Sequence, residues 1–167
     1  HLDNFSELYY YLIAYFLMNI GAFAVFTAIS KASGHEEISG FAGLYYRAPW
    51  TSVAMVVFIL SLGGLPITGG FFGKLFIMIG ALHMDLYWLA IVMIITSVIS
   101  LYYYFGIIKQ MFMRSANTAK DIVITLPLSI TIWICVVLTV LMGIFPQWLI
   151  VEVNNIFSVV NDLFIRS

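Results

Sequence analysis

The chain has 167 residues, of which 63% are hydrophobic and only 9% are charged, and its mean hydropathy is +1.05. This composition excludes a soluble globular domain and is typical of an integral membrane protein. The net charge of −1 offers no basic surface for nucleic acid, which we therefore do not expect as a partner.

Residues 8–29 form the first predicted membrane span, because a predominantly apolar run of this length crosses a bilayer. Its beginning is crowded by four tyrosines: Tyr9, Tyr10, Tyr11 and Tyr15. We expect such aromatic side chains at a membrane interface. Asn19 lies deep in the span among small residues, which favours helix packing over a role in an ion path.

Residues 49–82 contain a stretch in which glycines and a proline interrupt an otherwise apolar sequence. The interrupting residues are Gly63, Gly64, Pro66, Gly69, Gly70 and Gly73. Because such residues extend a helix poorly, we predict a helical break over 63–70, with Thr68 as a candidate N-cap of the second piece. Non-helical backbone survives at membrane depth only where protein buries it or where it lines a wet cavity.

Lys74 follows this break, at a depth where a charge costs ~2.5 to 3.5 kcal/mol on insertion scales. A charged residue in such a place marks a functional site by default. Carbonyls left unpaired near Leu62 favour an ammonium, whereas the N-terminus of the second helical piece favours its loss. We therefore predict that Lys74 relays protons. The alternatives are a lysine paired with a carboxylate elsewhere and a lysine that snorkels.

The distribution of charge indicates whether residues 49–82 cross the membrane once or twice. A single discontinuous span places five basic residues on one side: Lys31, Arg47, Lys109, Arg114 and Lys120. The positive-inside rule then favours this arrangement and places loops 30–48 and 109–121 in the cytoplasm.

Residues 86–108 form the next predicted span, and residues 122–145 form the last one. The first of these carries Thr96, Ser97, Ser100 and Tyr104 at helical spacing. Together with Thr68, the residues Ser97, Ser100 and Tyr104 are our candidate polar path to Lys74. Bonding of the hydroxyls to their own helix is an equal alternative.

Residues 147–167 alternate apolar with polar side chains, which predicts an amphipathic helix on the membrane surface or against a partner. The predicted fold is therefore an all-α membrane protein. Residues 1–146 make a bundle of about four transmembrane helices, one of them discontinuous, and residues 147–167 make the amphipathic helix.

A resemblance to a known family rests on three runs of sequence: YYLIAYFLMNIGAFAV, LSLGGLPITGGFFGKLFIMIGAL and SVISLYYYFGIIKQMF. They resemble the antiporter-like membrane subunits of respiratory complex I, the proton-pumping NADH-quinone oxidoreductase. The resemblance is to the N-type (subunit 2-like) branch, and it covers nearly the whole chain. The M-type carries a glutamate where Lys74 stands, and the L-type follows its lysine with an aspartate where Leu75 stands here.

This resemblance implies the second half of an antiporter-like inverted-repeat fold, with Lys74 on the hydrophilic axis that carries protons. It implies no cofactor in this chain, with NADH, flavin, iron–sulfur clusters and quinone in other subunits, and we predict no metal site. The expected partners are other membrane subunits, the lipid bilayer and the missing N-terminal half of a parent chain. The expected location is a bacterial cell membrane.

Two other interpretations stay open. One is a subunit of a multisubunit cation/proton antiporter, whose large subunits look similar. The other is a truncated chain that serves as a non-pumping scaffold. Neighbouring genes for nicotinamide and iron–sulfur subunits would favour the pump, and the upstream reading frame tests the truncation.

Overall fold

The structure is a computed structural model that describes residues 2–34, 38–114 and 122–165, with side chains for 6–32, 34, 38–114 and 122–156. Parts of three predicted segments lie outside the described residues: 35–37 of the loop 30–48, 115–121 of the loop 109–121, and 166–167 of the helix predicted over 147–167. All regular elements of the described part are helices: α1 (Leu2–Ser33), η1 (Ile38–Phe41), α2 (Leu44–Arg47), α3 (Pro49–Gly63), α4 (Gly69–His83), α5 (Tyr87–Met113), α6 (Leu126–Ile144) and α7 (Pro146–Ile165).

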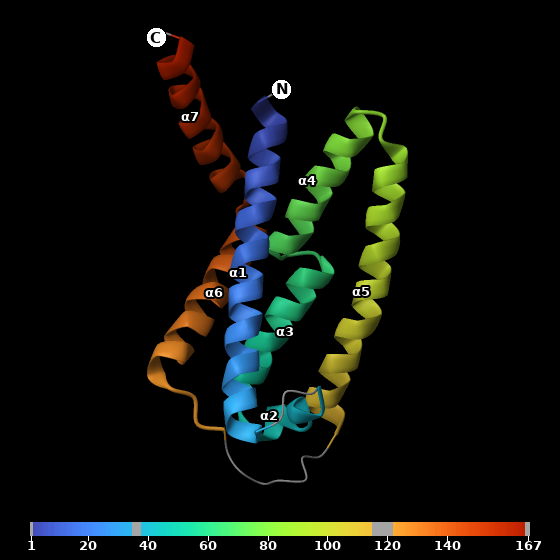
Figure 1. Ribbon diagram of the computed structural model, residues 1–167, viewed down its shortest axis with the longest axis vertical. Coiled ribbons are helices and arrows are strands. Elements are labelled where there is room, and N and C mark those ends of the chain that lie inside the picture. Colours follow the sequence, from blue (N-terminus) through green and yellow to red (C-terminus); the bar gives the residue numbers. More distant parts are fainter. Residues whose placement is uncertain (1, 35–37, 115–121, 166–167) are drawn as a thin grey trace.

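The long helices run side by side along one axis of the molecule (Figure 1). Within the described residues, three helices are long and apolar enough to cross a membrane: Ser6–Ala32 of α1, Tyr87–Met113 of α5 and Leu126–Ile144 of α6. The helices α3 and α4 are apolar but shorter, and α4 continues in the direction of α3 (Figure 1). Together they make one discontinuous crossing, which confirms the predicted fold class.

Basic residues gather at one end of this bundle. The last turn of α1 contains Lys31, the last turn of α2 contains Arg47, and Arg114 follows α5 directly. These three element ends lie together at the lower end in Figure 1. The single discontinuous crossing therefore leaves these charges on one side, and the assignment of that side to the cytoplasm stays a prediction.

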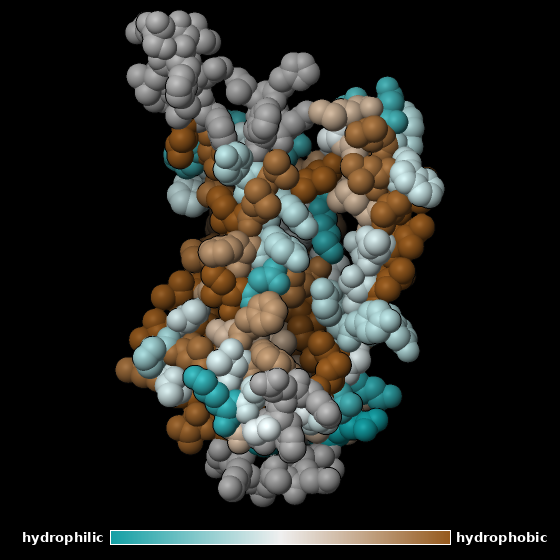
Figure 2. Space-filling model, in the orientation of Figure 1, coloured by the Kyte–Doolittle hydropathy of each residue, from teal (hydrophilic) through white to brown (hydrophobic). Residues whose placement is uncertain are grey.

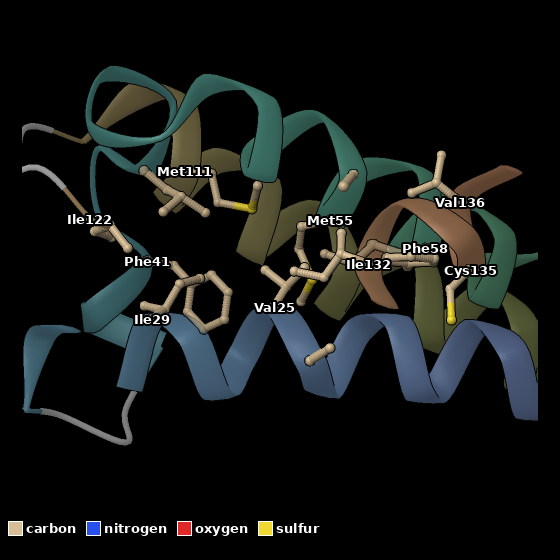
Figure 3. Packing of buried hydrophobic residues seen from close by; sticks show 14 residues of the cluster. Val25, Ile29, Phe41, Met55, Phe58, Met111, Ile122, Ile132, Cys135 and Val136 are labelled. Carbon is tan, nitrogen blue, oxygen red and sulfur yellow. The ribbon is translucent and has the colours of Figure 1, made fainter. Parts of the chain in front are cut away.

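The main apolar cluster joins α1 to α3, α5 and α6 toward this basic end (Figure 3). Phe58 of α3 is fully buried at its centre, and its ring fills the space that Gly21 of α1 leaves open. A Cβ at Gly21 would lie 2.2 Å from that ring. Small residues at such a contact let two membrane helices approach closely. The cluster therefore fixes the position of α3, the first half of the discontinuous helix.

The last helix, α7, follows α6 after a bend and points toward the end where α1 begins (Figure 1). Its Asn154 accepts a hydrogen bond from the hydroxyl of Ser6, which ties α7 to the beginning of α1. A helix at the predicted C-terminal place is therefore present. Its location on a membrane surface, and the division of the chain at residue 146, stay predictions.

Hydrophobic residues cover large areas along both flanks of the side shown in Figure 2, as a lipid-facing surface requires. Hydrophilic residues gather near the lower end of the bundle (Figure 2). Hydrophilic side chains are also visible at mid-height between α1 and α5 (Figure 2). This mid-height position is where the discontinuity between α3 and α4 lies (Figure 1).

Candidate functional site

The first half of the discontinuous helix ends in a glycine turn. Gly64 has a φ of 76°, in the left-handed region that glycine adopts most easily. Its N–H donates to the carbonyl of Ser61 at 2.9 Å, and the N–H of Leu65 donates to that of Leu60 at 3.0 Å. This pair of bonds is the Schellman pattern that closes many helices. The break therefore begins as an ordered helix end.

The hydrogen bond that caps the second half comes from Ser61 and not from Thr68. Thr68 occupies the N-cap position of α4, but its side chain makes no capping bond and instead donates to the Leu65 carbonyl at 2.7 Å. The hydroxyl of Ser61, on α3, accepts a hydrogen bond of 3.2 Å from the N–H of Gly70. The predicted N-cap position of Thr68 is confirmed, but its side chain does not cap the helix. A side chain from the other half-helix takes that role because α3 and α4 meet closely.

Two glycines allow backbone to pack closely at the break, one between α3 and α4 and one between the break and α6. A Cβ at Gly70 would lie 2.0 Å from the carbonyl oxygen of Ser61. A Cβ at Gly143, near the end of α6, would lie 2.2 Å from the carbonyl oxygen of Ile67. Real Cβ atoms do not approach backbone so closely, so both positions require glycine. The break is thus held between the end of α3 and the end of α6.

Lys74 lies in the second turn of α4 and is half-buried at the junction of the two halves. Its Nζ donates to the carbonyl oxygen of Leu62 at 2.8 Å, and it lies 3.5 Å from the hydroxyl of Ser97 on α5. Gly64 packs against the lysine stem, because a Cβ there would be 3.2 Å from the Lys74 Cδ. The ammonium therefore occupies the gap that the open helix creates, next to a carbonyl near the end of α3.

Lys74 also separates two cavities of different character. The first has a volume of about 260 Å³, and six hydroxyl-bearing side chains line it together with the lysine: Tyr11, Tyr15, Thr96, Ser97, Ser100 and Tyr104. The second, of about 220 Å³, is lined mainly by apolar residues, among them Phe71, Met78 and Leu101. The first cavity has room for several water molecules and the polar groups to hold them. The second offers few such groups.

The candidate polar path is partly assembled around this hydroxyl-lined cavity. Ser97, Ser100 and Tyr104 all line it with Lys74, whereas Thr68 is not among its lining residues. Ser100 donates its proton to the Thr96 carbonyl at 2.8 Å, so its hydroxyl also bonds to its own helix. The hydroxyl of Ser97 thus faces Lys74, as the polar path predicts, whereas that of Ser100 lines the cavity but bonds to its own helix. Their part in proton transfer stays a prediction.

Tyr11 and Tyr15 are cavity residues that sequence reasoning placed elsewhere. We expected them at a membrane interface, but they line the hydroxyl-lined cavity beside Lys74. Their rings stack with centroids 5.7 Å apart, and Tyr11 packs against Gly73. The available signal was their spacing of four residues, which places both on one face of α1.

None of the side chains that line the hydroxyl-lined cavity in the described part of the chain is a histidine, cysteine or carboxylate. Hydroxyls and one ammonium form no ligand set for a transition metal. What this arrangement can do chemically is hold a proton on Lys74 and accept or donate hydrogen bonds through waters and hydroxyls.

Comparisons with known proteins place this geometry in a family context. The family model described as "NADH:quinone oxidoreductase/Mrp antiporter, TM" matches residues 2–100. NADH-quinone oxidoreductase subunit N of Paenibacillus sp. (strain JDR-2) is 54% identical over 99% of this chain and 32% of its own length. Subunit N of Bacillus anthracis is 44% identical, and NAD(P)H-quinone oxidoreductase subunit 2 of Prochlorococcus marinus is 36% identical. The chain thus spans about a third of the length of these relatives.

Solved structures share the fold. A chain of respiratory complex I from Thermus thermophilus with bound aureothin aligns with a TM-score of 0.72 and 25% identity, covering 84% of this chain and 33% of that one. A chain of an archaeal membrane-bound sulfane sulfur reductase aligns with a TM-score of 0.73 at 22% identity, covering 83% and 29%. The second likeness concerns the fold alone.

Proposed function

The chain belongs to the NADH:quinone oxidoreductase/Mrp antiporter transmembrane family, as the sequence resemblance predicts, and from this premise we propose that it is part of a proton-translocating subunit of NADH-quinone oxidoreductase. In this proposal Lys74 is the group that takes up and releases the proton. The relatives named subunit N and subunit 2 support the assignment to NADH-quinone oxidoreductase. The geometry of the break supports the choice of Lys74 as the proton carrier.

The observation that carries the proposal is the position of the Lys74 ammonium between two half-helices. The Leu62 carbonyl at 2.8 Å stabilises the charged form, and the N-terminal end of α4 nearby disfavours positive charge. Because the two influences oppose each other, a modest change in nearby charge shifts the balance between ammonium and amine. The hydroxyl-lined cavity supplies the waters that bring the proton to the lysine and take it away.

The proposal also covers the rest of the complex and the orientation of this chain in the membrane. Electron transfer from NADH to quinone, with flavin and iron–sulfur clusters, takes place in other subunits, and this chain couples to it through neighbouring membrane subunits. The complete subunit contributes the first inverted repeat. The basic end of the bundle faces the cytoplasm of a bacterial cell.

The test is Lys74→Ala, introduced into the chromosome of the organism that carries this sequence. Inverted membrane vesicles report NADH-driven proton uptake, NADH:quinone activity and the amount of assembled complex. We expect proton uptake to fall while assembly stays largely intact. The matched control is Lys109→Ala, which removes an exposed lysine from α5 and leaves uptake unchanged. Full proton uptake in Lys74→Ala would refute the relay role.

The same vesicles separate the pump from an antiporter subunit. Without NADH, an imposed sodium gradient drives proton exchange only if an antiporter is present. Loss of this exchange in Lys74→Ala, with NADH-driven uptake unchanged, would assign the chain to the antiporter branch of its family instead.

A further inference from the structure

We propose that Glu7 receives the proton from Lys74 through Tyr11, so that these three residues form an outlet toward the end of the bundle where α1 begins. The inference rests on the proposed function and adds a direction and an acceptor to it. It starts from a contact between α1 and α4 that the sequence did not predict.

Glu7 lies in the second turn of α1, directly before the predicted span of residues 8–29. The part of α1 that is long and apolar enough to cross a membrane is Ser6–Ala32, so Glu7 lies at its beginning. The neighbouring Ser6 is fully buried and bonds to Asn154 of α7. Glu7 itself is half-buried, and its Oε2 would lie 3.3 Å from a Cβ at Gly80 of α4. Gly80 therefore gives the Glu7 carboxylate room against α4.

Tyr11 is the residue of α1 that lines the hydroxyl-lined cavity and lies one helical turn from Glu7. It contacts Gly73 of α4, the residue before Lys74, and it lines the cavity together with Lys74. Glu7 lies one helical turn before Tyr11, so the two share a face of α1 with a rise of about 6 Å between them. Side chains of a helix lean toward its N-terminus, so the Tyr11 ring leans toward Glu7.

The same rule explains why Lys74 needs an intermediate. Its side chain leans toward the N-terminus of α4, where its Nζ bonds to the Leu62 carbonyl. Gly80 is six residues beyond Lys74 in the opposite direction, a rise of about 9 Å. Lys74 therefore points away from Glu7, and Tyr11 with water in the cavity spans the distance. Because α1 packs antiparallel to α4, the order along the bundle is Lys74, then Tyr11, then Glu7 (Figure 1).

The proton transfer balances without any further reactant except water. The Lys74 ammonium gives its proton to a cavity water or to the Tyr11 oxygen and becomes a neutral amine. Tyr11 passes its own hydroxyl proton on and regains one, so it ends unchanged. The Glu7 carboxylate binds the proton, becomes a neutral acid and then releases the proton to the aqueous phase at its end of the bundle. Lys74 is protonated again from the cavity's other connections.

The test compares chromosomal variants in the assembled complex, using proton uptake per electron transferred in inverted vesicles. Glu7→Gln keeps shape and hydrogen bonding but removes the acceptor, and Tyr11→Phe removes only the hydroxyl. We expect each to lower proton uptake about tenfold or more, because loss of a positioned proton donor or acceptor has effects of ~10²-fold or more on single steps. Glu7→Asp should restore part of the uptake, which a purely steric role would not predict.

The matched control is Asp85→Asn, which removes a carboxylate from the exposed turn between α4 and α5 at the same end of the bundle. It should leave uptake unchanged. Normal uptake in Glu7→Gln, with loss in Lys74→Ala, would overturn the outlet and leave the proposed function standing. Normal uptake in Lys74→Ala would overturn the proposed function itself. If Glu7→Gln fails to assemble, Tyr11→Phe decides, and normal uptake per complex in Tyr11→Phe overturns the outlet.

Discussion

The Nζ of Lys74 donates a 2.8 Å hydrogen bond to the carbonyl oxygen of Leu62, and this bond joins the two halves of the discontinuous helix. A hydrogen bond from an ammonium is roughly twice as strong as one from a neutral donor. Loss of the proton therefore weakens the tie between α3 and α4 at the same moment that it changes the charge. In the proposed relay, proton release from Lys74 would therefore also loosen the packing of α3 against α4.

Gly64→Ala should weaken the site without removing any charged group. The φ of 76° disfavours alanine by about 1 to 2 kcal/mol, and the new Cβ would press on the Lys74 stem at 3.2 Å. We expect lower proton uptake and a lower unfolding temperature of the complex, measured on vesicles and on the purified complex. Gly34→Ala is the control, because its φ is also positive while nothing lies within 4 Å of its added Cβ. Equal pumping defects in both variants would contradict the contact with Lys74.

Gly143→Ala should disturb the break from the side of α6. The added Cβ would lie 2.2 Å from the Ile67 carbonyl oxygen, and overpacking of this kind destabilises by about 1 to 3 kcal/mol. The expected result is less assembled complex, measured by native gel and by thermal unfolding. Gly106→Ala on α5 serves as the control, since nothing lies within 4 Å of its added Cβ and alanine favours a helix. Wild-type stability in Gly143→Ala would contradict the described packing.

Tyr10→Phe tests the attachment of α1 to the end of α6. Tyr10 is fully buried, and its hydroxyl donates to the Met142 carbonyl at 2.6 Å. Removal leaves a buried carbonyl without this donor, which destabilises by about 1 to 3 kcal/mol. Thermal unfolding should show the loss, whereas Tyr102→Phe, at a side chain that is 77% exposed, should show none. An unchanged unfolding temperature in both would mean that the bond contributes nothing.

Ser97→Ala should have a small effect on proton uptake. The distance of 3.5 Å between its hydroxyl and the Lys74 Nζ indicates a weak direct bond. A net contribution near 0.5 kcal/mol corresponds to about a twofold change. Thr131→Val on α6 is the control, because its hydroxyl donates to the Pro127 carbonyl of its own helix at 3.0 Å. A loss as large as that of Lys74→Ala would show that Ser97 carries the proton directly.

Sequence reasoning succeeded where the determining forces are local. Glycines and Pro66 interrupt a helix with little influence from their surroundings, so the existence of the break could be predicted. Its extent could not: the predicted break covers 63–70, whereas α3 ends at Gly63 and α4 already begins at Gly69, so Gly63, Gly69, Gly70 and Gly73 are helical. The energetic cost of a buried charge likewise depends on Lys74 and the apolar residues around it. Both features are properties of one short segment.

Sequence reasoning failed where depth and direction depend on other helices. Tyr11 and Tyr15 carry the aromatic signature of an interface, but α1 is long and packs along α4, which brings both to the cavity. The N-cap position of Thr68 was predictable, but the capping hydroxyl of Ser61 was not, because it comes from across the break. Contacts of this kind require the relative placement of α3 and α4, which no local pattern contains.

The close fit of Gly64 against the Lys74 stem sets the range over which the side chain can swing. A lysine on a smooth helix surface samples many rotamers, but here the turn blocks one side and leaves the hydroxyl-lined cavity on another. The terminal nitrogen of Lys74 can therefore reach fewer positions than that of a lysine on an open helix surface. In the proposed relay, this restriction limits the positions from which the ammonium can transfer its proton, and it favours transfer into the hydroxyl-lined cavity.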